Sequence, residues 1–383
     1  MKKIISDTRF SNRVAVLRIL RERPTTRAAL ARETGLTRAA ITNITFDLIH
    51  DGMIFEGDVA VSDTAGRKGI CLQIDPSSRY AVGISITRKN IEVSLCDLFG
   101  RITATTVIEH SKTADETVDE IEKTVRALIT KEGKDESKFI GGGICAPGPV
   151  DSQNGVILNP VGLGQFENYP IAAVLSEKFG RTFTLERDTN AFAIAEKSFV
   201  PERAYLYLLA DEGLGSCYVA DGAAFHGFGG FGCELGHVGI PGSVKPCRCG
   251  NIGCAELYAS VQAALEYASE RGTNFDSWHS VVSAAEKGDE KAISVVRHEA
   301  EMLFSPCVTA VNLFEPDVII LGGMLAEKPQ MICDILETKL SAATLTRAYH
   351  KVKVRASKCA GGANSGAAAM TVLELFFNGG IKQ

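Results

Sequence analysis

Residues 234–256 read ELGHVGIPGSVKPCRCGNIGCAE, and this stretch constrains the fold and chemistry of the chain more than any other. Four side chains of metal-ligand type lie within 18 residues, with the spacing H-x9-C-x-C-x4-C: His237, Cys247, Cys249 and Cys254. A structural Zn²⁺ ion takes four soft nitrogen and sulfur ligands in a closed tetrahedron. Gly250 and Gly253 follow the second thiol, where a chain folding tightly round an ion needs positive φ. The pattern predicts structural zinc; the alternative is a cluster of reduced thiols in an ordinary loop.

The bulk composition indicates a globular protein of two or three domains, with 383 residues, 45% hydrophobic and 23% charged. No apolar run approaches 18 residues, so we expect no membrane span, and the basic start MKKIISDTRFSNR lacks the apolar region of a signal peptide. The cysteines number eleven, and those outside the motif are scattered. This usage is typical of reduced thiols, and we therefore expect a cytoplasmic protein.

Positive charge is concentrated at the N-terminus. Residues 1–48 hold ten Lys/Arg and four Asp/Glu, a net of +6, whereas the whole chain carries −5. A basic end on an acidic body favours a module that binds a polyanion. The alternative is a solvated helical face.

The same basic end has the pattern of a winged helix-turn-helix. An amphipathic helix runs from Ser11 to Pro24, Thr25 or Thr26 can cap a second helix, and Gly35 can make the turn into a third. The third helix is capped by Thr37, and residues 53–75 indicate two strands joined by a turn. Side chains near the start of the third helix would face outward, where a recognition helix meets base edges. The alternative is a three-helix packing unit without a DNA role.

The family resemblance rests on ELGH followed by CRCGNIGCAELYAS, which are similar to the signature of the ROK family of repressors, open reading frames and sugar kinases. ROK repressors also resemble residues 1–74, including a Gly-Arg pair after the wing, here Gly66-Arg67. From the pattern and the resemblance together, the residues predicted to contact DNA are Arg27, Thr37, Arg38, Thr42, Asn43, Arg67 and Lys68.

The resemblance implies an α/β fold: an N-terminal winged helix-turn-helix followed by a two-lobed actin/hexokinase-like (ribonuclease H-like) ATPase-type domain. Past Pro76 the chain alternates strands and helices, as that fold requires. The expected domains are the DNA-binding domain 1–74, lobe 1 over 75–200, closed by a C-terminal helix over 365–380, and lobe 2 over 201–364 with the zinc loop.

Two loops that hold ATP phosphates in ROK kinases depart from the family pattern here. The first runs Gly-Ile-Asp-Ile-Gly-Gly-Thr-Lys in the family and GISITRKN at residues 83–90 of this chain, so Ser85 replaces the carboxylate expected to organise Mg²⁺. The second runs Gly-Thr-Gly-Ile-Gly in the family and DEGLG at 211–215 here, which puts two carboxylates where polyphosphate would approach. We therefore expect no kinase activity and no catalytic residue.

The sugar side is closer to the family pattern. Asp188 aligns with the aspartate that deprotonates the sugar hydroxyl in ROK kinases; without ATP it would serve as a hydrogen-bonding group. The resemblance implies that Glu234 and Glu256 touch sugar hydroxyls, and that His237 both binds zinc and reaches the sugar. Arg187 and Gly162 stand where the family commonly has Asn. Arg187 either contacts the ligand or pairs with Glu186, Asp188 or Glu234.

These features predict a sugar-responsive DNA-binding transcriptional regulator, a repressor, with a zinc-braced sugar pocket and a degenerate ATP site. Its partners would be operator DNA, a sugar or sugar derivative, and further copies in a homodimer or homotetramer. One alternative is a ROK sugar kinase with an accessory N-terminal domain. The other is a DNA-binding protein that senses no ligand and uses its body only to dimerise.

Overall fold

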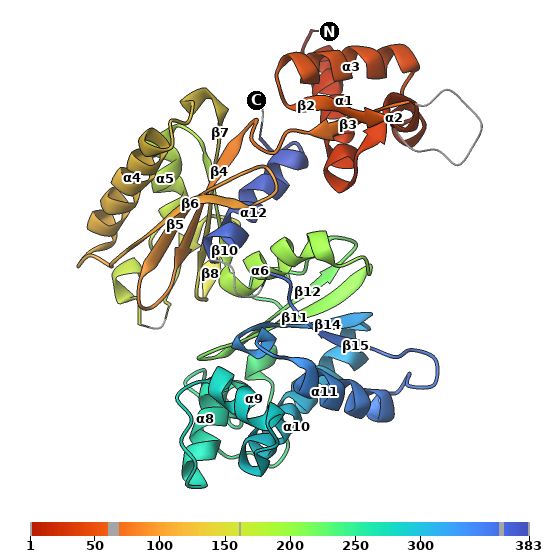
Figure 1. The fold of residues 1–383 in the computed structure, drawn as a ribbon. Helices are drawn as coiled ribbons and strands as arrows, with labels where there is room; N and C mark the ends of the chain where they lie inside the picture. The colour runs from red at the N-terminus through yellow and green to blue at the C-terminus, as the bar shows by residue number, and fades with distance from the viewer. Residues whose placement is uncertain (1, 60–68, 161, 360–363, 382–383) are drawn as a thin grey trace. The chain divides into compact units, whose positions relative to one another are not determined.

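The computed structural model describes residues 2–59, 69–160, 162–359 and 364–381, and its chain divides into two compact units (Figure 1). Unit 1 comprises Met1–Gly148, Asn154–Glu186 and Asn364–Gln383, and unit 2 comprises Pro149–Gln153 and Arg187–Ala363. The N-terminal module thus shares a unit with the first lobe, and the division falls after Glu186 instead of near residue 200. Among the described helices, none combines the length and apolar character needed to cross a bilayer.

The N-terminal module of unit 1, called the reader below, consists of three helices and a small sheet. The helices are α1 (Lys2–Glu22), α2 (Arg27–Thr34) and α3 (Arg38–His50), and the strands are β1 (Thr25–Thr26), β2 (Ile54–Val59) and β3 (Ile70–Ile74). The side chains of Thr26 and Thr37 cap α2 and α3, and Gly35 takes a left-handed conformation with φ 70° between them. The antiparallel pairing of β2 with β3 forms the expected wing strands. These elements have the predicted order of a winged helix-turn-helix.

Lobe 1, the rest of unit 1, is a mixed sheet with the strand order β10-β7-β4-β5-β6. Its strands are β4 (Tyr80–Ile86), β5 (Ile91–Cys96), β6 (Ile102–Ile108), β7 (Phe139–Ala146) and β10 (Thr182–Arg187). Helices α4 (Ala114–Lys131) and α5 (Ile171–Phe179) lie on one face and α12 (Asn364–Phe377) on the other (Figure 1). Strands β4 and β7 are buried along their whole length because helices cover both faces. Between β7 and α5 the chain forms β8 (Val150–Asp151), which belongs to unit 2, and then β9 (Val156–Ile157) and the 3₁₀ turn Gly164–Phe166 of unit 1.

Unit 2 is built on a second mixed sheet, ordered β13-β12-β11-β14-β15. Its strands are β11 (Ala204–Ala210), β12 (Leu214–Ala220), β13 (Ala223–Ala224), β14 (Val318–Gly323) and β15 (Lys353–Ala356). Its helices are α6 (Asp188–Glu196), α7 (Glu256–Ala259), α8 (Val261–Glu270), α9 (Trp278–Glu286), α10 (Glu290–Phe314) and α11 (Gln330–Ala343).

Alternation along β11 assigns the two faces of that sheet. Leu206 and Leu208 join the core formed with α10 and α11, whereas Tyr205 donates a hydrogen bond to the carbonyl of Ala193 on α6, and Tyr207 stacks on Phe192. Helix α6 is therefore part of unit 2, which is why the division of the chain precedes it.

Candidate functional site

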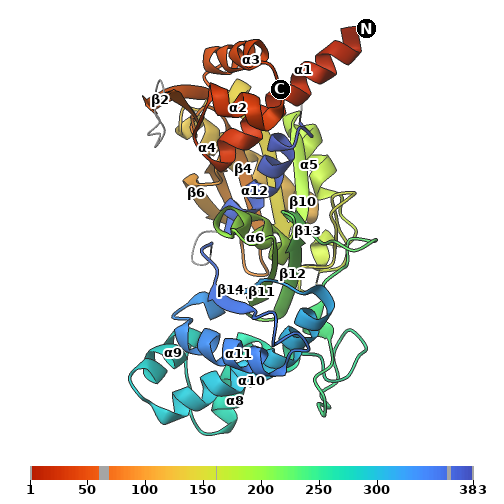
Figure 2. The same cartoon turned by 90° about the vertical axis from the view of Figure 1, so that its right-hand side faces the viewer.

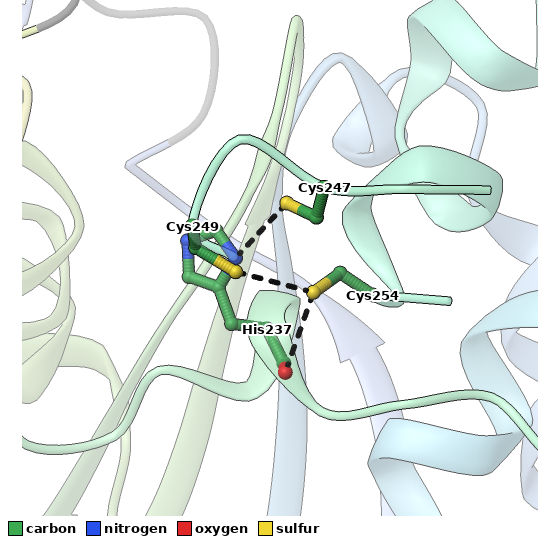
Figure 3. Close-up of side chains that lie close together, drawn as sticks. All are labelled: His237, Cys247, Cys249 and Cys254. Atoms are coloured by element: carbon green, nitrogen blue, oxygen red, sulfur yellow. Dashed lines mark hydrogen bonds between the residues drawn. The ribbon is translucent and has the colours of Figure 1, made fainter. Parts of the chain in front are cut away.

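The four predicted metal ligands come together in unit 2 (Figure 3). Their ligand atoms all lie within 4.8 Å of one another, and Cys249 Sγ lies 3.5 Å from Cys254 Sγ. Two thiols, Cys247 and Cys254, are buried and Cys249 is exposed. Three thiols and one imidazole at this separation are a ligand set that could hold a tetrahedral Zn²⁺ ion.

The local chain explains why the cluster forms. The 3₁₀ turn Leu235–His237 supplies the imidazole, and isolated bridges pair Gly239 with Cys254 and Pro246 with Ile252. Gly250 and Gly253 have φ of 94° and 75°, which places the chain reversals where the sequence predicted them. The loop thus returns its last thiol to the histidine that begins it.

Glu256 joins this cluster to the loop between β11 and β12. Its Oε1 lies 3.7 Å from His237 Nδ1 and 3.6 Å from Cys247 Sγ, whose thiol donates to it. Its Oε2 faces Gly213, where a Cβ atom would lie 3.3 Å away. Glu256 and His237 are therefore neighbours, as the family pattern implied.

Arg187 is buried, and its guanidinium forms an ion pair with Glu234. Its Nη2 also donates to Asn190 Oδ1 at 3.0 Å, to the Ser216 carbonyl at 2.7 Å and to the Gly232 carbonyl at 3.4 Å. One of the ion pairs predicted for Arg187, that with Glu234, is present in the structure. The sequence pattern did not indicate Asn190 and Ser216, because their contacts with Arg187 depend on the fold.

The backbone on either side of Glu234 is held in a defined conformation. Cys233 has φ 64°, a left-handed conformation that is costly for a residue with a Cβ atom. Ser216 Oγ donates to the Cys233 carbonyl at 2.5 Å and accepts from the Leu235 amide at 3.1 Å. The two bonds hold the chain on both sides of Glu234.

Asp188 begins α6, and its Oδ1 accepts from the Thr189 amide at 2.6 Å. Asp188 lies close enough to Asp211 to affect its pKa. Burial is the main cause that raises the pKa of Asp211 to about 6, and the negative charges of Asp188 and Glu212 raise it further, whereas a hydrogen bond from the Met324 amide lowers it. That bond, 2.7 Å to Asp211 Oδ1, ties the loop 211–215 to the turn after β14. The structure thus places Asp188 in an acidic region of unit 2.

In unit 1, the side chain of Thr87 forms hydrogen bonds within the loop after β4. Thr87 Oγ1 accepts from the amides of Lys89 at 3.2 Å and Asn90 at 3.1 Å. Those N–H groups are the kind that cradle phosphate in a glycine-rich loop, and here they are satisfied internally. Ser85, at the site of the family carboxylate, is buried.

The reader presents most of the predicted DNA contacts on its surface. Arg38, Thr42 and Asn43 are exposed on α3, and Thr37 is exposed at its cap. Arg27 differs, because its Nε donates to Thr45 Oγ1 at 3.0 Å and its Nη1 lies 2.8 Å from Glu56 Oε1, so it braces α3 and the wing strand β2. Arg67 and Lys68 lie outside the described residues.

The sequence profile of the ROK family matches residues 81–373. The chain belongs to the ROK family. Among its relatives, the xylose repressor of Bacillus subtilis (strain 168) is 25% identical over 342 residues, covering 87% of each chain. The DNA-binding transcriptional dual regulator NagC of Escherichia coli (strain K12) is 27% identical over 352 residues, covering 87% of this chain and 85% of that one.

Two solved ROK structures cover this chain to different extents. A ROK family transcriptional regulator described as a homolog of the E. coli MLC protein has a TM-score of 0.82, 25% identity and 97% coverage of both chains. A ROK hexokinase from Thermus thermophilus has a TM-score of 0.64, 25% identity, and covers 78% of this chain and 99% of its own. The regulator leaves out only 3% of 383 residues, about eleven, so its likeness includes most of the reader.

We expect Arg187→Met to lower the free energy of unfolding by about 1–3 kcal/mol, because it leaves the buried Ser216 carbonyl without this donor. Arg203→Met in the same unit is the matched control: Arg203 Nη2 lies 2.8 Å from Asp221 Oδ1 with both side chains largely exposed, so the loss should be about 0–1 kcal/mol. Urea unfolding measures both. Equal losses would show that Arg187 does not stabilise the site.

Proposed function

We propose that the protein is a sugar-responsive transcriptional repressor that binds operator DNA through α3 and a sugar through unit 2. The observation that carries this proposal is that a solved ROK transcriptional regulator covers 97% of this chain, whereas the ROK hexokinase covers 78% of it. The names of the relatives, a xylose repressor and NagC, support the same class. We further propose that the protein works as a homodimer or homotetramer, because palindromic operators suit even-numbered assemblies.

The ligand site that we propose consists of Asp188, Glu234, His237 and Glu256, with Arg187 acting through Glu234. Carboxylates and an imidazole are suited to accept and donate hydrogen bonds to sugar hydroxyls. The only arginine of the set is already neutralised by Glu234, and Asp211 and Glu212 add negative charge nearby. A neutral sugar therefore fits this site better than a sugar phosphate or sugar acid.

Catalysis of phosphoryl transfer is the alternative function, and two observations weigh against it. In unit 1, Thr87 satisfies the amides of the first loop. In unit 2, the carboxylate of Asp211 is directed at the turn after β14, where a Cβ atom on Gly323 would lie 2.4 Å from Asp211 Oδ1. Internal contacts therefore take the place of phosphate contacts in both loops.

A thermal-shift screen against D-xylose, N-acetylglucosamine, D-glucose and their phosphates tests the ligand class. We expect a neutral sugar to stabilise the protein, by about 2.7 kcal/mol at 100 times its Kd. Glu256→Gln should reduce that shift. We also expect no ATP-dependent phosphorylation of the sugar that binds. Turnover in a coupled kinase assay that disappears in Asp188→Asn would establish the alternative.

We propose that His237, Cys247, Cys249 and Cys254 hold one structural Zn²⁺ ion per chain, and we expect stoichiometric zinc in protein purified without chelator. Cys254→Ser should lower zinc content and thermal stability together, because metal binding contributes to the folding free energy. Cys307→Ser is the control, since Cys307 is equally buried in unit 2 but outside the cluster. Elemental analysis that finds no zinc in the wild-type protein would contradict the assignment.

The DNA role is tested with sites selected from a random duplex pool by the wild-type protein. Arg38→Ala should weaken binding to the selected site more than to random DNA, by about 1–3 kcal/mol if Arg38 reads a guanine edge. Arg32→Ala, which removes an exposed arginine of α2, should affect both DNAs equally. Binding should fall steeply with salt because phosphate contacts release counterions. Absence of any DNA binding at low salt would exclude the repressor function.

A further inference from the structure

Two faces of helix α1 make packing contacts. One face packs inside the reader, and the other contacts lobe 1. Val16 and Leu20 are buried in the reader core, and Arg13 Nη2 lies 2.8 Å from Asp51 Oδ2 just past α3. Phe10 and Val14, four residues apart, share another face. A Cβ atom on Gly379, just after α12, would lie 3.2 Å from Val14 and 3.3 Å from Phe10. The second face of α1 therefore rests on the C-terminal end of lobe 1.

Arg21 provides the polar contact of this second face. Its Nη1 lies 2.7 Å from Glu374 Oε1, and its Cζ lies 4.4 Å from the centroid of the Phe377 ring. The side chains of Arg21 and Glu374 are 14% and 18% exposed, so solvent screens this pair less than a surface ion pair. A planar guanidinium can bind a carboxylate and stack on a ring at once, which a lysine cannot reproduce.

The other end of α12 is fixed to the lobe 1 sheet by backbone contact. A Cβ atom on Gly83 of β4 would lie 1.8 Å from the Ser365 carbonyl oxygen, and one on Gly143 of β7 would lie 1.8 Å from that of Ala368. The Ser365 amide also donates to Glu92 Oε1 at 3.0 Å. Helix α12 is thus packed on lobe 1 at its start and reaches α1 near its end (Figure 2).

The chain link between reader and lobe 1 is short and also anchored. Five residues separate Ile74 of β3 from Tyr80 of β4. Within this link the Asp75 amide donates to the Met53 carbonyl at 2.9 Å, and the Leu98 amide donates to the Pro76 carbonyl at 3.0 Å. The reader is therefore attached at two separate places, one through the chain and one through Arg21. Two attachments restrict rotation far more than a single flexible linker does.

We infer that Arg21, Glu374 and Phe377 form a joint that makes the reader and lobe 1 one rigid body. Given the proposed repressor function, these are positioning residues: they touch neither DNA bases nor sugar, and they transmit any movement of lobe 1 to α3. A sugar that changes DNA affinity would then act by moving reader and lobe 1 together. Without the joint, the reader would keep its own fold and lose its fixed orientation.

Hydrogen exchange of the full-length protein tests the joint without DNA or sugar. In Arg21→Ala we expect amides in the last turns of α1 and α12 to exchange at least about tenfold faster, with α3 unchanged. Glu374→Gln, altered on α12, should reproduce the effect without perturbing the reader core. Arg23→Ala is the control, because Arg23 pairs with Glu33 inside the reader at 2.8 Å with both side chains more exposed. Unchanged exchange in α12 of Arg21→Ala would overturn the inference.

Two further measurements separate positioning from simple stabilisation. The exchanged pair, Arg21→Glu with Glu374→Arg, should restore slow exchange if the contact itself matters. With N-acetylglucosamine or D-xylose as probe, the sugar-dependent change in affinity for the selected DNA site should be lost in Arg21→Ala, while affinity without sugar stays within about twofold. If the wild-type protein shows no sugar response, the proposed function fails while hydrogen exchange still decides the joint. A full sugar response in Arg21→Ala would show that the joint does not position the reader.

Discussion

The contact of α12 with β4 and β7 is the constraint on which unit 1 depends. At Gly83 and Gly143 the helix backbone approaches the strands so closely that no Cβ atom fits. A helix laid this near a sheet buries its whole side, and its residues Ala367–Met370 are all buried. Because α12 comes from the far end of the chain, lobe 1 cannot complete its core until the C-terminus is in place. Near its end, the same helix carries Glu374 and Phe377, which contact Arg21 of the reader.

The proposed function requires a kinase-like domain that binds a ligand without phosphate chemistry, which is physically reasonable because the two tasks use different loops. Loops that hold polyphosphate need free amides and room for close approach. Here a threonine hydroxyl takes up the amides of one loop, and an aspartate bridges the other to its neighbour. In the proposed function, these internal hydrogen bonds stabilise the two loops in place of nucleotide contacts. The carboxylates of unit 2 remain, and hydroxyl recognition needs only such groups.

Local signals in the sequence predicted the elements well. Thr37 and Gly35 marked the ends of helices because capping and positive φ depend on neighbouring residues alone. Helix α1 begins at Lys2, whereas the sequence predicted a start at Ser11. The prediction used only the apolar residues that follow Ser11 and did not include the face of the helix that carries Phe10. The spacing H-x9-C-x-C-x4-C predicted that His237 and the three cysteines form one cluster, and the structure brings them together.

Long-range partners could not be predicted in the same way. Three carboxylates were candidates for an ion pair with Arg187, and the pair with Glu234 depends on tertiary contacts within unit 2 that the sequence does not reveal. Arg27 was predicted to contact DNA, and its ion pair with Glu56 on the wing strand β2 was not evident from the sequence. The predicted division near residue 200 ignored α6, whose packing against β11 depends on tertiary contacts with Tyr205 and Tyr207.

The arrangement of unit 2 couples the metal cluster to the carboxylates of the proposed ligand site. Glu234 precedes the turn that carries His237, and Glu256 begins α7 two residues after Cys254. A metal bound by His237 and Cys254 would therefore fix the separation of the two glutamates through very short chain segments. Arg187 holds Glu234 from the other side, through contacts to Asn190 and the Ser216 carbonyl. The same few residues therefore determine both the stability of the metal cluster and the geometry of the proposed ligand site. A substitution that changes one should also change the other.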